Sequence, residues 1–295
     1  MSEKLDVYNR VTSKIIADLE RGNLTWLQPW QAGHAAGEIS RPLRVTGKPY
    51  RGINIVMLWA SAMENGFSCP IWLTYKQAVE LDGQVRKGEK GSLVVYADTL
   101  TKIETDDKGE NRKTEIPFMK GYTVFNAEQI DNLPAHFYAR PDAAQREISR
   151  QETAEQFFAA SGGTILHGGS RAFYSPTNDV VQMPKIETFR DTESYYATLA
   201  HEMTHWTRHE TRLNRDFGLK RFGDEGYAME ELVAEIGAAF LCADLGITPE
   251  TREDHAAYIA SWLKVLKQDK RAIFTAASHA QRAVEHLHAY QLQEA

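Results

Sequence analysis

His201-Glu202-Met203-Thr204-His205 is the most informative stretch of the chain. Residues four apart on a helix share one face, with their Cβ atoms about 6 Å apart. Two imidazoles spaced in this way can hold one tetrahedral metal ion, and Glu202 then stands beside it. Asp191 or Thr192 can cap the helix, and no glycine or proline interrupts it before Gly218. We therefore predict a helix over residues 195–209 that carries a metal site.

A catalytic zinc site takes three protein ligands and keeps one position open, so a third ligand must come from another segment. Glu231 and Glu235 lie one turn apart on an otherwise apolar helix, where carboxylates are costly unless a cation or a donor meets them. We assign Glu231 as the ligand and Glu235 as the acceptor of a histidine N–H. The reverse assignment stays open, and His209, one turn beyond His205, is an alternative ligand. The expected ion is Zn²⁺, with Mn²⁺ as the other possibility.

Such a site indicates hydrolysis of peptides. Zinc lowers the pKa of a bound water to about 7, and Glu202 is predicted to act as the general base. Tyr227 is a candidate donor to the oxyanion, the alternative being a tyrosine packed at a helix start. A strand over 180–183 is predicted to hold an extended peptide at its edge, or else to be an ordinary edge strand.

Composition limits the class of protein. The chain has 295 residues, of which 42% are apolar and 25% charged, which is enough for about two domains. Cys69 and Cys242 are its only cysteines, so a disulfide framework and a four-cysteine zinc site are excluded. The first 30 residues carry many charges, unlike a signal peptide, and the apolar run over 53–63 is too short to span a membrane. We expect a cytoplasmic protein without a membrane partner.

Periodicity predicts an α+β architecture. The helical segments are expected over 5–19, 54–63, 74–81, 143–161, 195–209, 230–245 and 254–287. Two paired strands are expected over 92–100 and 116–125, joined by a long exposed loop over 101–115. A second hairpin is expected over 172–183.

The first half of the chain mixes rings with cations. Residues 41–97 carry eight basic side chains against four acidic ones, whereas residues 141–295 carry 16 against 23. Single-stranded nucleic acid binds such surfaces, because bases stack on rings while cations meet the phosphates. The alternative is a solvated surface, with Trp59 in the core. The candidate DNA-binding residues are Trp26, Trp30, Arg44, Lys48, Tyr50, Arg51, Trp72, Lys76, Arg86, Lys87 and Lys90.

Several stretches also resemble a known family. Residues 44–55, 72–77, 83–91 and 124–129 resemble the N-terminal domain of the ArdC antirestriction family, a domain shared with the plasmid primase TraC. Met183-Pro184, the His201 motif with Trp206, and residues 230–241 resemble the zincin-like metallopeptidase domain that follows it in that family. The resemblance implies a plasmid-borne protein that binds single-stranded DNA without sequence preference and shields conjugative DNA from restriction.

Taken together, these observations predict two domains. A single-stranded DNA-binding domain of mixed helices and antiparallel strands is expected over 1–135, a linker over 136–145, and a gluzincin-type metallopeptidase domain over 146–295. The protein substrate is unknown. The main alternative is a DNA-coating protein whose zincin domain binds metal without turnover. A metal-dependent nuclease is disfavoured, because nuclease sites usually gather several carboxylates around hard cations.

Overall fold

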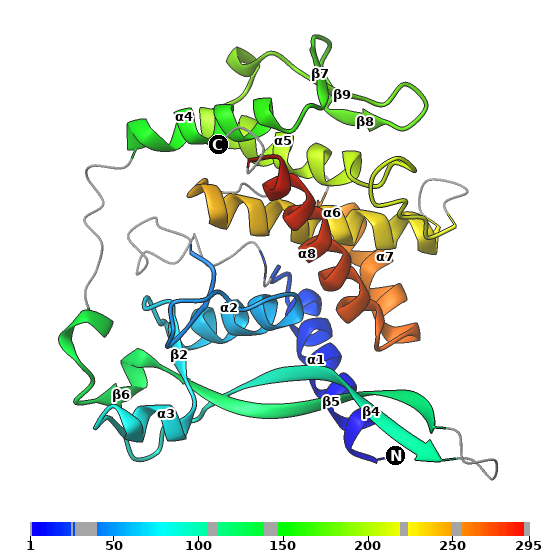
Figure 1. The fold of residues 1–295 in the computed structure, drawn as a ribbon. Helices are drawn as coiled ribbons and strands as arrows, with labels where there is room; N and C mark the ends of the chain where they lie inside the picture. Colours follow the sequence, from blue (N-terminus) through cyan, green and yellow to red (C-terminus); the bar gives the residue numbers. More distant parts are fainter. Residues whose placement is uncertain are drawn as a thin grey trace.

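The computed structural model describes residues 2–24, 26, 40–105, 111–138, 147–218, 224–248 and 255–291, and it is built from helices and strands in both halves (Figure 1). The first half contains α1 (Ser2–Glu20), β1 (Leu43–Arg44), α2 (Ile53–Asn65), β2 (Ile71–Leu73), α3 (Tyr75–Glu80), β3 (Gln84–Val85), β4 (Ser92–Thr105), β5 (Asn111–Asn126) and β6 (Ile130–Asp131). The second half contains α4 (Glu147–Ala160), β7 (Thr164–His167), β8 (Phe173–Ser175), β9 (Val180–Met183), α5 (Thr192–Trp206), α6 (Glu225–Leu245), α7 (His255–Gln268) and α8 (Ala272–Gln291). The predicted α+β class is confirmed.

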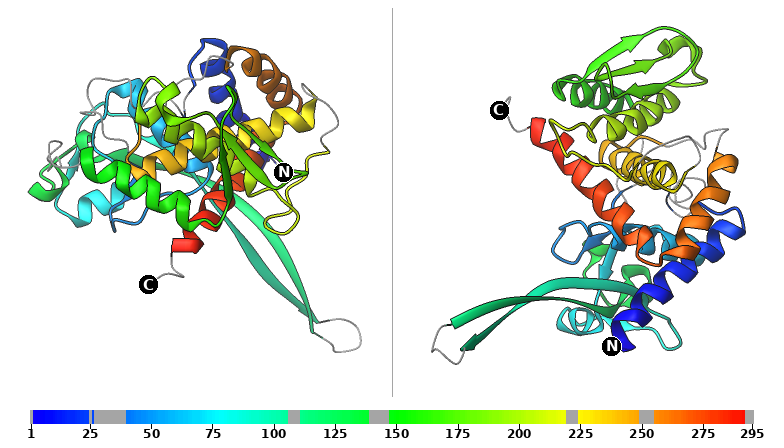
Figure 2. Two further views of the ribbon diagram at one scale, coloured as in Figure 1. Left: turned by 90° about the horizontal axis from the view of Figure 1, so that it is seen from above. Right: turned by 90° about the vertical axis from the view of Figure 1, so that its right-hand side faces the viewer.

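The longest strands, β4 and β5, form a hairpin that projects from the body of the molecule (Figure 2). Their antiparallel register runs from Ser92 opposite Val124 to Thr105 opposite Asn111. The prediction of a long loop over 101–115 is therefore wrong, since residues 101–105 and 111–115 continue the two strands. The β-branched residues Thr101, Ile103 and Thr105 alternate with charged residues, a pattern that favours strand over loop. The middle of the predicted loop, residues 106–110, lies outside the described residues.

The base of this hairpin joins a four-stranded sheet and holds α2. The strand order is β1-β2-β5-β4, and a separate pair is formed by β3 and β6. The buried Asn54 amide donates to the Val95 carbonyl and accepts from the Val95 N–H, at 2.8 Å each. Both bonds satisfy a polar group that burial would otherwise make costly, so they fix α2 on β4. α3 begins with a capping box between Thr74 and Gln77, within the segment predicted as a helix over 74–81.

The helices of the second half are layered around α6, which is buried along most of its length (Figure 1). The predicted helical run over 254–287 is interrupted at residues 269–271, where the Asp269 carboxylate accepts from the Arg271 N–H at 2.9 Å. β7, β9 and β8 form a sheet in that order. The predicted hairpin of β8 and β9 is present, while β7, which pairs with β9 in parallel, was not predicted.

Both halves contribute to one hydrophobic core. Trp26 meets Trp262 edge to face at a centroid distance of 5.8 Å, and Trp59, predicted as a core residue, meets Phe240 in the same way at 5.8 Å. The Thr12 hydroxyl also donates to the Lys270 carbonyl at 2.6 Å. The segments predicted as separate domains thus bury their apolar side chains against each other. Among the residues that the structure describes, no helix is both long and apolar enough to cross a membrane.

Candidate metal centre

The two histidines stand on α5, whose start and burial are fixed locally. The Asp191 carboxylate caps the helix by accepting from the Ser194 N–H at 2.8 Å. Among the buried side chains of α5 are Leu199 and Met203. Both His201 and His205 are buried as well. α5 ends at Trp206, so His209 lies beyond the helix, where its Nδ1 is 2.8 Å from the Thr211 hydroxyl, and it does not join the two histidines.

A close approach of α6 brings three glutamates to this pair. A Cβ on Gly237 of α6 would lie only 2.6 Å from Cγ2 of Thr204 on α5. The two helices therefore pack so closely here that only glycine fits at position 237. Asp224 caps α6 by accepting from the Tyr227 N–H at 2.7 Å. Further along α6, Glu230, Glu231 and Glu235 are all buried. The helix contact therefore directs acidic side chains to the face that carries the imidazoles.

His201, His205 and Glu231 form a group with metal-ligand spacing. The two Nε2 atoms are 3.2 Å apart, and the Glu231 carboxylate oxygens lie 3.5 Å from each of them. Bonds of 2.0–2.1 Å at tetrahedral angles separate ligand atoms by about 3.3 Å, so the group fits a zinc-sized ion. Glu235 instead lies 3.3 Å from His201 Nδ1, on the side of the ring away from Nε2. This agrees with the prediction of Glu231 as the ligand and Glu235 as the partner of the His201 ring.

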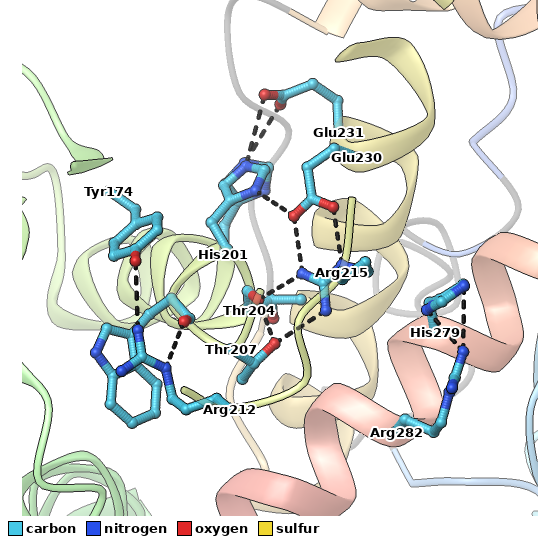
Figure 3. Close-up of polar contacts among 12 residues, drawn as sticks. Tyr174, His201, Thr204, Thr207, Arg212, Arg215, Glu230, Glu231, His279 and Arg282 are labelled. Carbon is cyan, nitrogen blue, oxygen red and sulfur yellow. Dashed lines mark hydrogen bonds and ion pairs between the residues drawn. The ribbon is translucent and has the colours of Figure 1, made fainter. Parts of the chain in front are cut away.

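Glu230 and Arg215 extend the site, and the sequence interpretation missed both. Glu230 lies 3.0 Å from His205 Nδ1. Arg215 donates two hydrogen bonds of 2.8 Å to the Glu230 carboxylate (Figure 3). The Arg215 guanidinium also donates to the Thr207 hydroxyl and the Thr204 carbonyl. The only signal in the sequence was a third glutamate beside Glu231, because Arg215 comes from a loop that no motif marks.

The electrostatics of the buried cluster favour ionised carboxylates. Burial raises the pKa of Glu230, but hydrogen bonds from Arg215 and His205 outweigh it and hold that pKa at about 2. Burial also raises the pKa of Glu231, yet the charge of His205 and the bonds to both imidazoles keep it well below its usual value. Burial lowers the pKa of His205, and Glu231 and Glu230 together raise it to about 10. His201, His205 and Glu231 would present ionised carboxylate and imidazole groups to a divalent cation, and His205 would have to be neutral to bind it.

The remaining residues predicted for catalysis lie at the same place. Glu202 is buried next to His201 on α5. The Tyr227 hydroxyl is 3.1 Å from the Tyr258 hydroxyl, and burial followed by the charge of Glu231 raises the pKa of Tyr227, so it stays a phenol.

Val180–Met183 is strand β9, which lies between β7 and β8. The prediction that β9 is an edge strand is wrong, since both of its sides already pair, and only β7 and β8 present edges in this sheet.

The predicted rings of the first half are buried. Trp26, Trp72 and Tyr50 expose only 0%, 1% and 3% of their surface, so their assignment as stacking platforms is wrong. Their apolar faces fill the core instead. Trp30 lies outside the described residues. The predicted cations, by contrast, are all exposed, namely Arg44, Lys48, Arg51, Lys76, Arg86, Lys87 and Lys90.

Several of these cations already have partners. Arg51 pairs with Glu285, and Lys76 lies 3.6 Å from Glu80. Arg86 contacts Glu89, Asp131 and the Glu128 carbonyl. Arg86 therefore holds its own loop in place, and Lys87 and Lys90 remain the outward cations of that loop.

Known proteins share both halves of this arrangement. Residues 5–125 match the family model for the N-terminal domain of the anti-restriction factor ArdC, and residues 152–279 match that for a zincin-like metallopeptidase. The chain is 46% identical to protein y4eC of Sinorhizobium fredii, over 97% of this chain and 92% of that one. It is 40% identical to the DNA primase TraC of Escherichia coli over 98% of this chain, which spans only 27% of the primase.

Two solved structures have the same fold. The metal-free antirestriction ArdC protein of plasmid R388 superposes with a TM-score of 0.81, at 48% identity over 98% of both chains. The Mn(II)-bound structure of that protein superposes with a TM-score of 0.78, at 46% identity over 96% of this chain and 97% of that one.

The fold and the buried histidine–glutamate group define a protein with a zincin-like domain, preceded by a domain of the ArdC N-terminal type. The chain belongs to the ArdC antirestriction family.

Proposed function

We propose that this protein binds single-stranded DNA and protects incoming conjugative DNA from restriction in the cytoplasm, and that it carries a metallopeptidase site. The observation that carries this proposal is the likeness to the R388 antirestriction protein along 98% of both chains at 48% identity. The exposed cations of the first half supply the sequence-independent attraction to a polyanion. The acidic second half contributes none of this attraction.

For the metal centre we propose His201, His205 and Glu231 as ligands of one divalent ion, Zn²⁺ or Mn²⁺. The Mn(II)-bound relative supports a divalent ion. The bound ion supplies a Lewis acid that polarises a carbonyl and activates water. Glu202 accepts a proton from the attacking water and delivers it to the leaving amine. Glu235 and Glu230 orient His201 and His205 by accepting their Nδ1–H groups, and Tyr227 offers its hydroxyl to the oxyanion.

Two variants test the metal centre. His205→Ala removes a ligand, so elemental analysis of the purified protein should show loss of the single bound ion. Glu202→Ala removes the base but no ligand, so it should keep the ion and lose hydrolysis of a peptide substrate. An undiminished metal content in the first variant, or equal peptidase rates for the second variant and the wild type, contradicts the assignment.

The rival function is a DNA-coating protein that holds metal without turnover. Restriction of plasmid DNA during conjugation separates the two, with Glu202→Ala compared with the wild type. If hydrolysis of a protein substrate is needed, the variant gives no protection while still binding single-stranded DNA. If the variant protects as well as the wild type, coating alone accounts for the activity and the peptidase role is wrong.

A further inference from the structure

A hollow of about 290 Å³ lies between α1, α2 and the start of β4, away from the metal centre. We propose that it binds one nucleotide of single-stranded DNA, with the two phosphates that flank this nucleotide on its rim and the base on its floor. The inference rests on the proposed DNA binding and assigns it to a place. The volume is close to the lower limit of about 300 Å³ for small-molecule sites, which suits a single nucleotide and not a duplex.

The rim of the hollow is positively charged. Arg10 and Lys14 of α1 and Lys90 of the loop before β4 line it, and Glu64 of α2 is the one acid among the described residues that line it. Arg10 and Lys90 are exposed, and neither forms an ion pair with the residues that the structure describes. Lys14 lies 2.7 Å from Glu64. With Lys14 and Glu64 neutralising each other, Arg10 and Lys90 give the rim two cations for phosphate.

The loop that carries Lys90 is held in a fixed shape. Gln129 donates to the Glu89 carboxylate at 2.8 Å and to the Lys90 carbonyl at 3.0 Å. Arg86 occupies the other side of Glu89 at 2.8 Å. A Cβ on Gly91 would lie 2.2 Å from Cγ2 of Thr123, so the backbone lies directly on β5. The cation at position 90 is therefore presented by a positioned backbone, which reduces the entropy lost on binding.

The interior of the hollow suits a base. Val11 and Ile15 of α1, Met57 of α2 and Leu93 of β4 provide apolar contacts. Ser61, Asn65 and Ser92 provide hydrogen-bonding groups, and the Ser61 and Ser92 hydroxyls are 2.6 Å apart. A purine or pyrimidine has an apolar face, which can pack on the apolar side chains, and a polar edge, which can hydrogen-bond to the polar ones. Because these contacts read no particular edge pattern, binding should depend little on sequence.

A neighbouring hollow shows why the site ends where it does. It lies along the same two helices and shares Lys14, Ala60 and Glu64 with the first. Its other charged side chains, Asp18 and Arg21, pair with each other. Its lining residues therefore have no net charge, whereas the first hollow has a net charge of two positive units. Of these two hollows, the first is the one whose positive net charge is complementary to a phosphate.

The test compares two double variants in the full chain. Fluorescence anisotropy of a labelled oligothymidylate of about 12 nucleotides gives the affinity as a function of salt. Arg10→Ala with Lys90→Ala should weaken binding roughly tenfold at about 0.15 M salt and reduce the salt slope by about 1.4, since each phosphate contact contributes about 0.7. Arg171→Ala with Lys185→Ala removes the same charges from exposed positions of the second half and should change neither quantity.

A gain of affinity provides a second, independent measurement. Glu64→Gln removes the nearer of the two acids beside Lys14 and leaves Asp18 at 4.0 Å, so it should tighten binding up to about fourfold at about 0.15 M salt and steepen the slope by up to about 0.7. Its control, Glu225→Gln, frees Lys264 from an ion pair of 3.5 Å in the second half and should have no effect. If the wild type binds the oligothymidylate but the Arg10→Ala, Lys90→Ala variant binds it as tightly as the Arg171→Ala, Lys185→Ala control, the hollow is the wrong site. If the wild type does not bind at all, the proposed DNA binding fails and the inference fails with it.

Discussion

Replacing Arg215 with methionine should separate the folding role of the buried cluster from its metal-binding role. Arg215 is 3% exposed and donates two bonds of 2.8 Å to Glu230, one of 3.1 Å to Thr207 and one of 3.0 Å to the Thr204 carbonyl. Its loss leaves the Glu230 carboxylate buried with His205 as its only charged partner among the described residues. Breaking a buried pair in this way costs about 3–5 kcal/mol, so Arg215→Met should be strongly destabilised.

Removing the second charge should restore most of that stability. Arg215→Met combined with Glu230→Gln leaves no uncompensated charge, so the double variant should be more stable than Arg215→Met alone. Its coupling free energy, from a double-mutant cycle, should be about 2–4 kcal/mol. His205 nevertheless loses the charged partner at its Nδ1, so metal affinity should still fall about 10- to 100-fold.

Two assays give both quantities. Urea unfolding of the chelator-treated protein measures the free energy of unfolding, and competition with a chromogenic chelator measures the metal dissociation constant. Glu64→Gln, which alters an exposed pair, serves as the control for the loss of one carboxylate. Additive destabilisation in the cycle refutes the idea of one buried charge network, and unchanged metal affinity in Glu230→Gln refutes the orienting role of Glu230.

Three further expectations concern stability. His279 lies 2.8 Å from Arg282, and burial followed by the charge of Arg282 lowers its pKa to about 4. As the pH drops, this histidine therefore takes up a proton in the unfolded chain before it does so in the folded one. The free energy of unfolding should fall between about pH 7 and 5, by about 1 kcal/mol after screening by solvent. Urea unfolding of His279→Gln should show a smaller fall over the same pH range. Gly237→Ala should cost about 1–3 kcal/mol in the same assay and weaken metal binding, because its Cβ meets Thr204 at 2.6 Å. Thr74→Ala should cost about 1 kcal/mol through loss of the cap on α3, which thermal unfolding would detect.

The metal-ligand candidates could be found from the sequence because their spacing is local. His201 and His205 lie one turn apart on a helix, as do Glu231 and Glu235, and the structure brings three of the four into one group. The direction of Glu230 could not be predicted, since it depends on how α6 packs on α5. Arg215 is buried only because a loop folds back over Thr204 and Thr207. Contacts of this kind have no periodic signal in the chain.

The DNA-binding residues show the opposite limit. The predicted cations are exposed, but composition could not tell an exposed tryptophan from a buried one, and Trp26 and Trp72 are in the core. The strand over 180–183 was recognised by its residues, but its central place depends on β7, a parallel partner. Register within one hairpin can be read from neighbouring residues, whereas the order of strands in a sheet is a property of the whole domain.

The contact between Trp26 and Trp262 bears on how genes of this family can recombine. An exchange that separated α1 and α2 from α7 and α8 would expose apolar surface in both products, because one core draws on all four helices. The match to the TraC primase is consistent with inheritance in one piece, since it includes 98% of this chain within a protein almost four times longer. The matched part of the primase therefore includes both halves.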